Sequence, residues 1–201
     1  MDNSQNPVKY SRKTLALIET AKELFFRHGV RRITIEEICR KAGVSKMTFY
    51  RNFSSKSEIV RIIIAQIYDE ASVMLDDIMK SSMSFEEKIQ KVLSVKLEYT
   101  RSYSPEFIEE FAGSPDNDEI ASYINSLNEE YYNKVRDFIS AAKESGEINP
   151  ELSTDFIMYM MNALGEMFKD SNVRSLFADT EQLIREFFSF FYYGVLSRKN
   201  E

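Results

Sequence analysis

The chain has 201 residues, 43% of them hydrophobic and 29% charged, which is long enough to bury a core and too apolar for intrinsic disorder. Six glycines and four prolines are too few for a loop-rich β protein, and no run reaches the roughly 18 apolar residues of a membrane span. The N-terminal segment lacks the apolar core of a signal peptide, and one cysteine excludes an intrachain disulfide. These features predict a globular, cytoplasmic protein.

The net charge of −6 is distributed unevenly along the chain. Residues 1–56 contain 12 Lys and Arg against five Asp and Glu, whereas residues 57–201 contain 14 against 27. A basic segment on an acidic body attracts a polyanion at one end and repels it at the other, which orients the encounter. The alternative reading of the same distribution is an ordinary solvated surface with uneven charge.

The first predicted helix follows about ten polar residues and runs from about Ser11 to His28, with Gly29 as its C-terminal stop. Its expected inward face is apolar and comprises Leu15, Ile18, Ala21, Leu24 and Phe25. His28 is the only histidine, so we expect it to contact the last carbonyls of the helix rather than a metal ion.

Two short helices separated by a tight turn follow. Thr34 is placed to cap the first, since its hydroxyl stands three residues ahead of Glu37, and an apolar stripe at positions 35, 38, 39 and 42 follows. Gly43 can adopt the left-handed conformation that ends this helix, and Ser45 is placed to cap the next one. The pattern predicts a helix-turn-helix.

The second of these helices has two chemically different faces. Thr48, Phe49 and Phe53 are expected to serve the core. The remaining side chains are expected to point outward, and their chemistry suits phosphates and base edges: Lys46, Met47, Tyr50, Arg51 and Asn52.

The rest of the chain shows helical periodicity and no strand pattern. A long helix from Ser55 to about Lys80 is apolar on more than one face, as expected of a helix shared by two packed units. Further helices are expected at 84–102, 107–111, 116–146, 153–169 and after Asp179. We therefore predict an all-α fold of about nine or ten helices: a three-helix helix-turn-helix domain at 1–56 and a second helical domain at 57–201.

The N-terminal region resembles the DNA-binding domain of the TetR family of bacterial transcriptional regulators. The resemblance covers about the first quarter of the chain and rests most specifically on the run Ala42-Gly43-Val44-Ser45 followed by Thr48, Tyr50, Phe53 and Lys56. It implies that the helix at 45–53 enters the major groove of duplex DNA.

On this interpretation base edges are read by Lys46, Met47, Thr48 and Arg51. Phosphates are held by Tyr50, Asn52, Lys56 and the Thr34 end of the preceding helix. With the cap Ser45, these residues form the predicted DNA-binding set.

The last predicted helix carries six aromatic residues within positions 187–193 and is apolar nearly all round, so it must be covered on two sides. Burial inside the monomer is one explanation and a second subunit is the other, which we favour because the family pairs its last two helices across a dimer. The predicted homodimer interface comprises Met160, Leu164, Phe187, Phe188, Phe191, Tyr192 and Val195. Two recognition helices would then read a pseudo-palindromic operator.

The region between residues 97 and 168 is rich in aromatic and methionine side chains. It predicts a site for a small apolar or aromatic effector, with these candidate contacts: Tyr99, Tyr103, Phe107, Phe111, Tyr123, Tyr131, Met161 and Phe168. The structural alternative is that they are ordinary core residues.

The favoured function is a ligand-responsive repressor that effector binding releases from DNA. No nucleophile–base pair, phosphate-binding loop or metal cluster is recognisable, so we expect neither an enzyme nor a bound cofactor or metal. The alternative function is a DNA-bound structural protein whose C-terminal domain binds a protein partner. An accessible cavity of several hundred Å³ would favour the sensor, and a filled core would favour the alternative.

Overall fold

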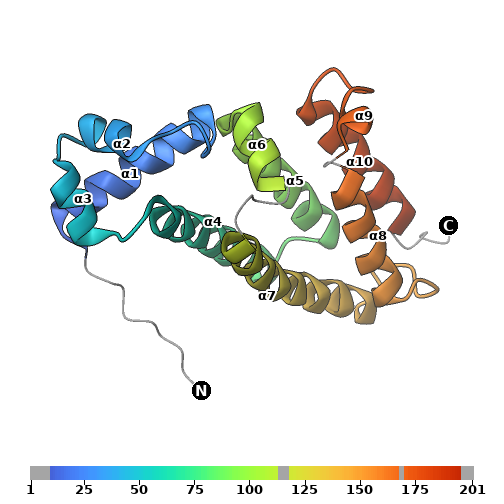
Figure 1. Cartoon of the computed structure of the whole chain (residues 1–201). Coiled ribbons are helices and arrows are strands. Elements are labelled where there is room, and N and C mark those ends of the chain that lie inside the picture. Colours follow the sequence, from blue (N-terminus) through green and yellow to red (C-terminus); the bar gives the residue numbers. More distant parts are fainter. Residues whose placement is uncertain (1–9, 113–117, 168–169, 196–201) are drawn as a thin grey trace.

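The computed structural model describes residues 10–112, 118–167 and 170–195, and within these ranges the chain is helical without a strand (Figure 1). The all-α prediction is therefore confirmed for the described residues. The helices are α1 (Arg12–His28), α2 (Ile35–Ala42), α3 (Lys46–Asn52), α4 (Lys56–Lys80), α5 (Phe85–Ser102), α6 (Pro105–Ala112), α7 (Asp118–Glu144), α8 (Thr154–Met167), α9 (Ser171–Arg174) and α10 (Thr180–Val195).

Hydroxyl caps set the starts of the three N-terminal helices. The side chains of Ser11, Thr34 and Ser45 each accept a hydrogen bond from the backbone N–H three residues later. At the end of α2, Gly43 has φ 69° and ψ 31°, in the left-handed region that favours glycine. The predicted helix-turn-helix is confirmed, with the predicted caps.

The buried face of α1 contains Leu17 and Thr14, which were not predicted, and lacks Leu15, which was. Leu17 is fully buried, whereas Leu15 is 43% exposed, so the prediction that Leu15 points inward was wrong. Leu17 lies four and seven residues before Ala21 and Leu24, which completes a stripe at helical spacing, and Leu15 lies outside that stripe.

One cluster of buried residues runs from the N-terminal helices into the rest of the chain. It joins Phe25 of α1 and Phe49 of α3 to Ile63 of α4, Phe107 of α6 and Ile124 of α7. A second cluster lies at the far end of α4 and α7 and includes Leu75, Phe138 and Ile157 of α8. The first cluster contains residues from both sides of position 56, so it does not separate two domains there. The predicted domain boundary at residue 56 stays a prediction.

The C-terminal helices α8, α9 and α10 stand at the other end of the molecule from α2 and α3 (Figure 1). The predicted segment at 107–111 is longer than expected, because Pro105 begins α6 at the helix position that tolerates a missing N–H. The sequence did not predict α9. Among the described residues no helix combines the length and the hydropathy that crossing a bilayer requires.

Candidate nucleic-acid interface

Helix α3 is anchored by aromatic residues on one side and exposed on the other. Phe49 is 0% and Phe53 2% exposed, and their ring centroids are 5.4 Å apart. In contrast, Met47 is 64% and Tyr50 57% exposed, and Lys46 and Arg51 are also exposed. The arrangement presents two cations, a thioether and a phenol to solvent along a rigid helix, as the sequence predicted.

Lys46 forms an ion pair with Glu36 of α2. The hydrogen bond between them raises the pKa of Lys46 and lowers the pKa of Glu36. Both side chains are more than half exposed, so the pair is open to competition from a stronger anion such as a phosphate. Glu36 was not in the predicted set.

Three hydroxyl residues of the predicted set lie at the starts of α2 and α3. Thr34 and Ser45 are exposed caps, and Thr48 is half-buried with its Oγ1 3.0 Å from the Oγ of Ser45. Each is placed at or near a helix N-terminus, where backbone N–H groups and the helix dipole favour an anion.

Asn52 was expected to face outward, but its side-chain amide is bonded inside the domain. The hydroxyl of Thr14 donates to Oδ1 of Asn52 at 2.7 Å, and Nδ2 of Asn52 donates to the Thr48 carbonyl at 2.6 Å. Asn52 therefore ties the end of α3 to α1.

Lys56 has a similar internal position in the first turn of α4. Its Nζ donates to the carbonyls of Val30 at 2.7 Å and Ile33 at 2.8 Å, both in the loop between α1 and α2. Burial lowers the pKa of Lys56, and the negative charge of Glu110 opposes that shift. The sequence shows only an unfavourable cation at a helix N-terminus, and the structure shows its partners.

Glu110 of α6 holds the same loop from the other side and was missed by the sequence analysis. Its carboxylate accepts hydrogen bonds from the backbone N–H groups of Val30 at 2.5 Å and Arg31 at 3.1 Å. The N–H of Ser104 also donates to the carbonyl of Phe26 in α1, at 2.7 Å. No local pattern could have revealed Glu110, because it lies 80 residues from Val30.

The structure divides the predicted effector-binding residues between separate places. Tyr99, Tyr103 and Phe107 form an aromatic group with Phe26 of α1, where the Phe26 and Tyr103 centroids are 4.6 Å apart. Tyr131 and Met161 pack on the second cluster of buried residues, and Tyr123 lies under the guanidinium of Arg61. Phe168 lies outside the described residues, as does the side chain of Phe111.

The larger of the two described cavities has a volume of about 680 Å³ and contains none of the predicted effector-binding residues. It is an open groove along one face of α4, bordered by Met83 of the loop before α5 and by Lys91 of α5. Its lining residues are Asp69, Glu70, Val73, Met74, Asp77, Ile78, Met83 and Lys91. A second cavity of about 480 Å³ lies at the start of α4, beside Tyr123.

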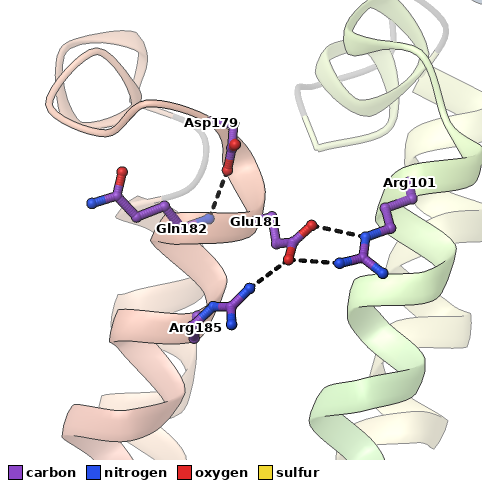
Figure 2. Close-up of polar contacts among 5 residues, drawn as sticks. All are labelled: Arg101, Asp179, Glu181, Gln182 and Arg185. Atoms are coloured by element: carbon purple, nitrogen blue, oxygen red, sulfur yellow. Dashed lines mark hydrogen bonds and ion pairs between the residues drawn. The ribbon is translucent and has the colours of Figure 1, made fainter.

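Figure 2 shows the polar contacts that connect α5 to the start of α10. The guanidinium of Arg101 on α5 donates to both carboxylate oxygens of Glu181 on α10, at 2.8 and 2.7 Å, and Arg185 contacts the same carboxylate. Asp179 caps α10 by accepting a hydrogen bond from the N–H of Gln182 at 2.8 Å, and α10 begins after Asp179 as predicted. Arg101 thus joins two helices in this structure.

Apolar side chains are exposed on α8 and α10, partly at other positions than predicted. Met160, Phe187 and Phe188 are half-buried, and the side chains of Leu164, Phe191, Tyr192 and Val195 lie outside what the structure describes. The most exposed large apolar residues of these helices are Phe156 at 50%, Tyr159 at 70%, Phe190 at 73% and Tyr193 at 75%. Exposure on this scale predicts a contact surface.

Comparison with known proteins gives one family match and several similar folds. Residues 17–63 match the model of the tetR family of bacterial regulatory proteins. The transcriptional regulator UidR of Escherichia coli is 22% identical over 156 residues, which cover 77% of each chain.

Two solved structures share the fold over nearly the whole length. A transcriptional regulator from Saccharomonospora viridis, in complex with choline, has a TM-score of 0.73 at 16% identity and covers 92% of this chain and 97% of its own. FadR of Bacillus subtilis, in complex with stearoyl-CoA, has a TM-score of 0.70 at 18% identity, covering 90% and 98%.

Proposed function

We propose that this chain, which belongs to the TetR family of bacterial regulatory proteins through its N-terminal helix-turn-helix domain, is a repressor that binds a pseudo-palindromic operator as a homodimer. Release from the operator follows the binding of a small effector in the C-terminal region. The observation that carries the proposal is α3, whose aromatic residues are buried in the core while its cations remain exposed.

On DNA, α3 lies in the major groove. Lys46, Met47 and Arg51 reach the base edges, where a guanidinium favours guanine and a thioether can contact a thymine methyl group. Tyr50 and the cap residue Thr34 hold phosphates, which fix the register of the protein on the duplex. Asn52 and Lys56 act indirectly, because their polar groups hold the recognition helix and the loop before α2 in place.

A homodimer places two such helices on one duplex. The exposed residues Phe156 and Tyr159 of α8 and Phe190 of α10 support a face-to-face contact of these helices with their copies. Two-fold symmetry makes the same patch serve both subunits, and it spaces the recognition helices about 34 Å apart along the DNA.

Effector binding is supported by the cavity of about 680 Å³ beside α4, a size that suits a small molecule. Similar folds hold choline in one case and stearoyl-CoA in another. The cavity favours the sensor over the alternative, a DNA-bound protein whose C-terminal part binds another protein. For release, the effector must bind more tightly to the conformation in which the two helix-turn-helix domains of the dimer do not fit the operator.

The test begins with selection of bound sites from random duplex DNA, followed by titration of the recovered sequence. Arg51→Ala is expected to cost roughly 1–3 kcal/mol on the selected operator and to change binding to random DNA much less, since a base contact is lost. The matched control is Arg136→Ala, which removes an exposed arginine of α7 that forms an ion pair with Asp155. Equal losses on operator and random DNA for Arg51→Ala would contradict the base-reading role of α3.

A further inference from the structure

The larger cavity, an open groove, is lined by apolar and by negatively charged side chains. Val73, Met74 and Ile78 of α4 and Met83 of the following loop supply the apolar surface. Val73 is 61% exposed, so it gives the groove apolar surface that a ligand would bury. Methionine side chains are flexible and polarizable, so such a surface adapts to ligands of different shape.

The charged side chains that line the cavity favour binding of a cation. Asp69, Glu70 and Asp77 contribute three carboxylates, and Lys91 contributes the one ammonium group among the described lining residues. Asp69 and Asp77 take part in no ion pair among the described residues. An apolar surface bordered by carboxylates complements a molecule that has an apolar body and one positive charge.

Glu70 already forms an ion pair with a lysine of α1, in the N-terminal helical region. The Nζ of Lys22 on α1 lies 3.0 Å from Oε1 of Glu70. The same ammonium lies 5.7 Å from the centroid of the Phe26 ring, which packs against Tyr103 in the turn between α5 and α6. The pKa of Tyr103 is raised by burial first, and the charges of Tyr99 and Glu70 add to the shift.

We infer that the cavity beside α4 binds an amphipathic organic cation, and that the positive group of this ligand displaces Lys22 from Glu70. The inference rests on the proposed function and specifies its effector site and effector class. The ligand and Lys22 compete for one carboxylate. Ligand binding therefore breaks the ion pair between α4, which lines the cavity, and α1, which is hydrogen-bonded to the recognition helix α3.

The binding test uses three probes with one octyl chain and different head groups: octyltrimethylammonium, octanoate and octanol. Each is titrated calorimetrically into the full chain without DNA and below its aggregation concentration. The cation is expected to bind more tightly than octanol, and octanoate more weakly. Preference for octanoate, equal binding of all three probes, or no binding of any of them would overturn the inference.

Three variants locate the site and test the competition. Glu70→Gln is expected to weaken binding of the cation about fivefold, and Lys22→Met to strengthen it about fivefold, as an exposed ion pair allows. Neither should change octanol binding, and Glu130→Gln, which removes an exposed carboxylate of α7, should change nothing. Unchanged cation affinity in both Glu70→Gln and Lys22→Met would refute the displacement of Lys22.

Failure of this inference is distinguishable from failure of the proposed function. The titrations contain no DNA, whereas operator selection contains no ligand. A chain that selects an operator but ignores the cation remains a DNA-binding regulator with another effector.

Discussion

Lys46 and Lys56 are ten positions apart on adjacent helices, and their ammonium groups have opposite environments. Lys46 is exposed and forms an ion pair with the exposed Glu36, whereas Lys56 is half-buried and donates hydrogen bonds to loop carbonyls. Both lysines were expected to contact DNA. The structure leaves Lys46 on the surface, whereas Lys56 binds the loop between α1 and α2.

We predict that Lys56→Met lowers the free energy of unfolding by about 1–3 kcal/mol, because the carbonyls of Val30 and Ile33 lose their donor. Lys46→Met, the matched control, should leave stability nearly unchanged and cost roughly 1–3 kcal/mol of binding to the selected operator, because a base contact is lost. Urea unfolding and DNA titrations at several salt concentrations measure the two effects. A stable Lys56→Met variant with a reduced salt slope would instead restore the phosphate contact first predicted for it.

Burial raises the pKa of Tyr103 to about 12, and the charges of Tyr99 and Glu70 add to the shift. The folded state therefore keeps its proton at a pH where the unfolded chain loses it. The stabilisation is complete below pH about 10 and is lost as the pH rises towards 12.

We predict that wild-type protein loses stability more steeply between pH 9 and about 11 than Tyr103→Phe, which has no proton to lose at this position. Urea unfolding midpoints measured across this range give the slopes. Tyr50→Phe is the control, since Tyr50 is 57% exposed, and it should follow the wild type. Parallel curves for wild type and Tyr103→Phe would show that Tyr103 does not contribute to the alkaline loss.

At the scale of elements, the loop between α1 and α2 is held from two sides. Lys56 of α4 binds its carbonyls and Glu110 of α6 binds its N–H groups. Gly29 opens the loop with φ 76° and ψ 162°, and a Cβ there would lie 2.7 Å from Oε1 of Glu110. A glycine is required by the backbone conformation and by the approach of α6.

We predict that Glu110→Gln lowers the free energy of unfolding by about 1–2 kcal/mol, since one charge-assisted acceptor of two backbone donors is replaced by a neutral one. Hydrogen exchange should become faster at the amides of Val30 and Arg31. Glu109→Gln is the neighbouring control, because Glu109 is exposed. Unchanged exchange at both amides would show that Glu110 does not hold the loop in solution.

At the scale of the whole molecule, the recognition helix and the exposed aromatic face lie at opposite ends. Helices α2 and α3 form one end of the molecule, and α8 to α10 form the other (Figure 1). A dimer formed through α8 and α10 therefore leaves both recognition helices exposed, and the acidic C-terminal region stands away from the DNA.

We predict that the double variant Tyr159→Asp, Phe190→Asp is monomeric, because each introduced carboxylate would be buried without a partner in the dimer. Sedimentation equilibrium measures the state, and operator affinity should fall at least about tenfold as one half-site contact is lost. Leu15→Asp, at an exposed leucine of α1, should remain dimeric. A wild-type protein that sediments as a monomer at every concentration would contradict the dimer itself.

The sequence by itself determined most of the helices and the caps of the N-terminal ones, because caps and apolar stripes act within a few residues, but it predicted neither α9 nor the start of α6. Thr34, Gly43 and Ser45 have the roles expected of them, and Phe49 and Phe53 are buried as predicted. The outward face of α3 follows from the same periodicity, which is why the exposed positions of Lys46, Met47, Tyr50 and Arg51 were predictable.

Only the tertiary structure decided which distant polar groups meet. Three hydrogen bonds join residues far apart in the sequence. Glu110 and Val30 are separated by 80 residues, Lys22 and Glu70 by 48, and Lys56 and Val30 by 26. Local periodicity predicts the face on which a side chain lies, but a partner is chosen by how helices pack. For the same reason the aromatic residues expected to form one effector site were divided between separate places, and the larger described cavity, along α4, is lined by none of them.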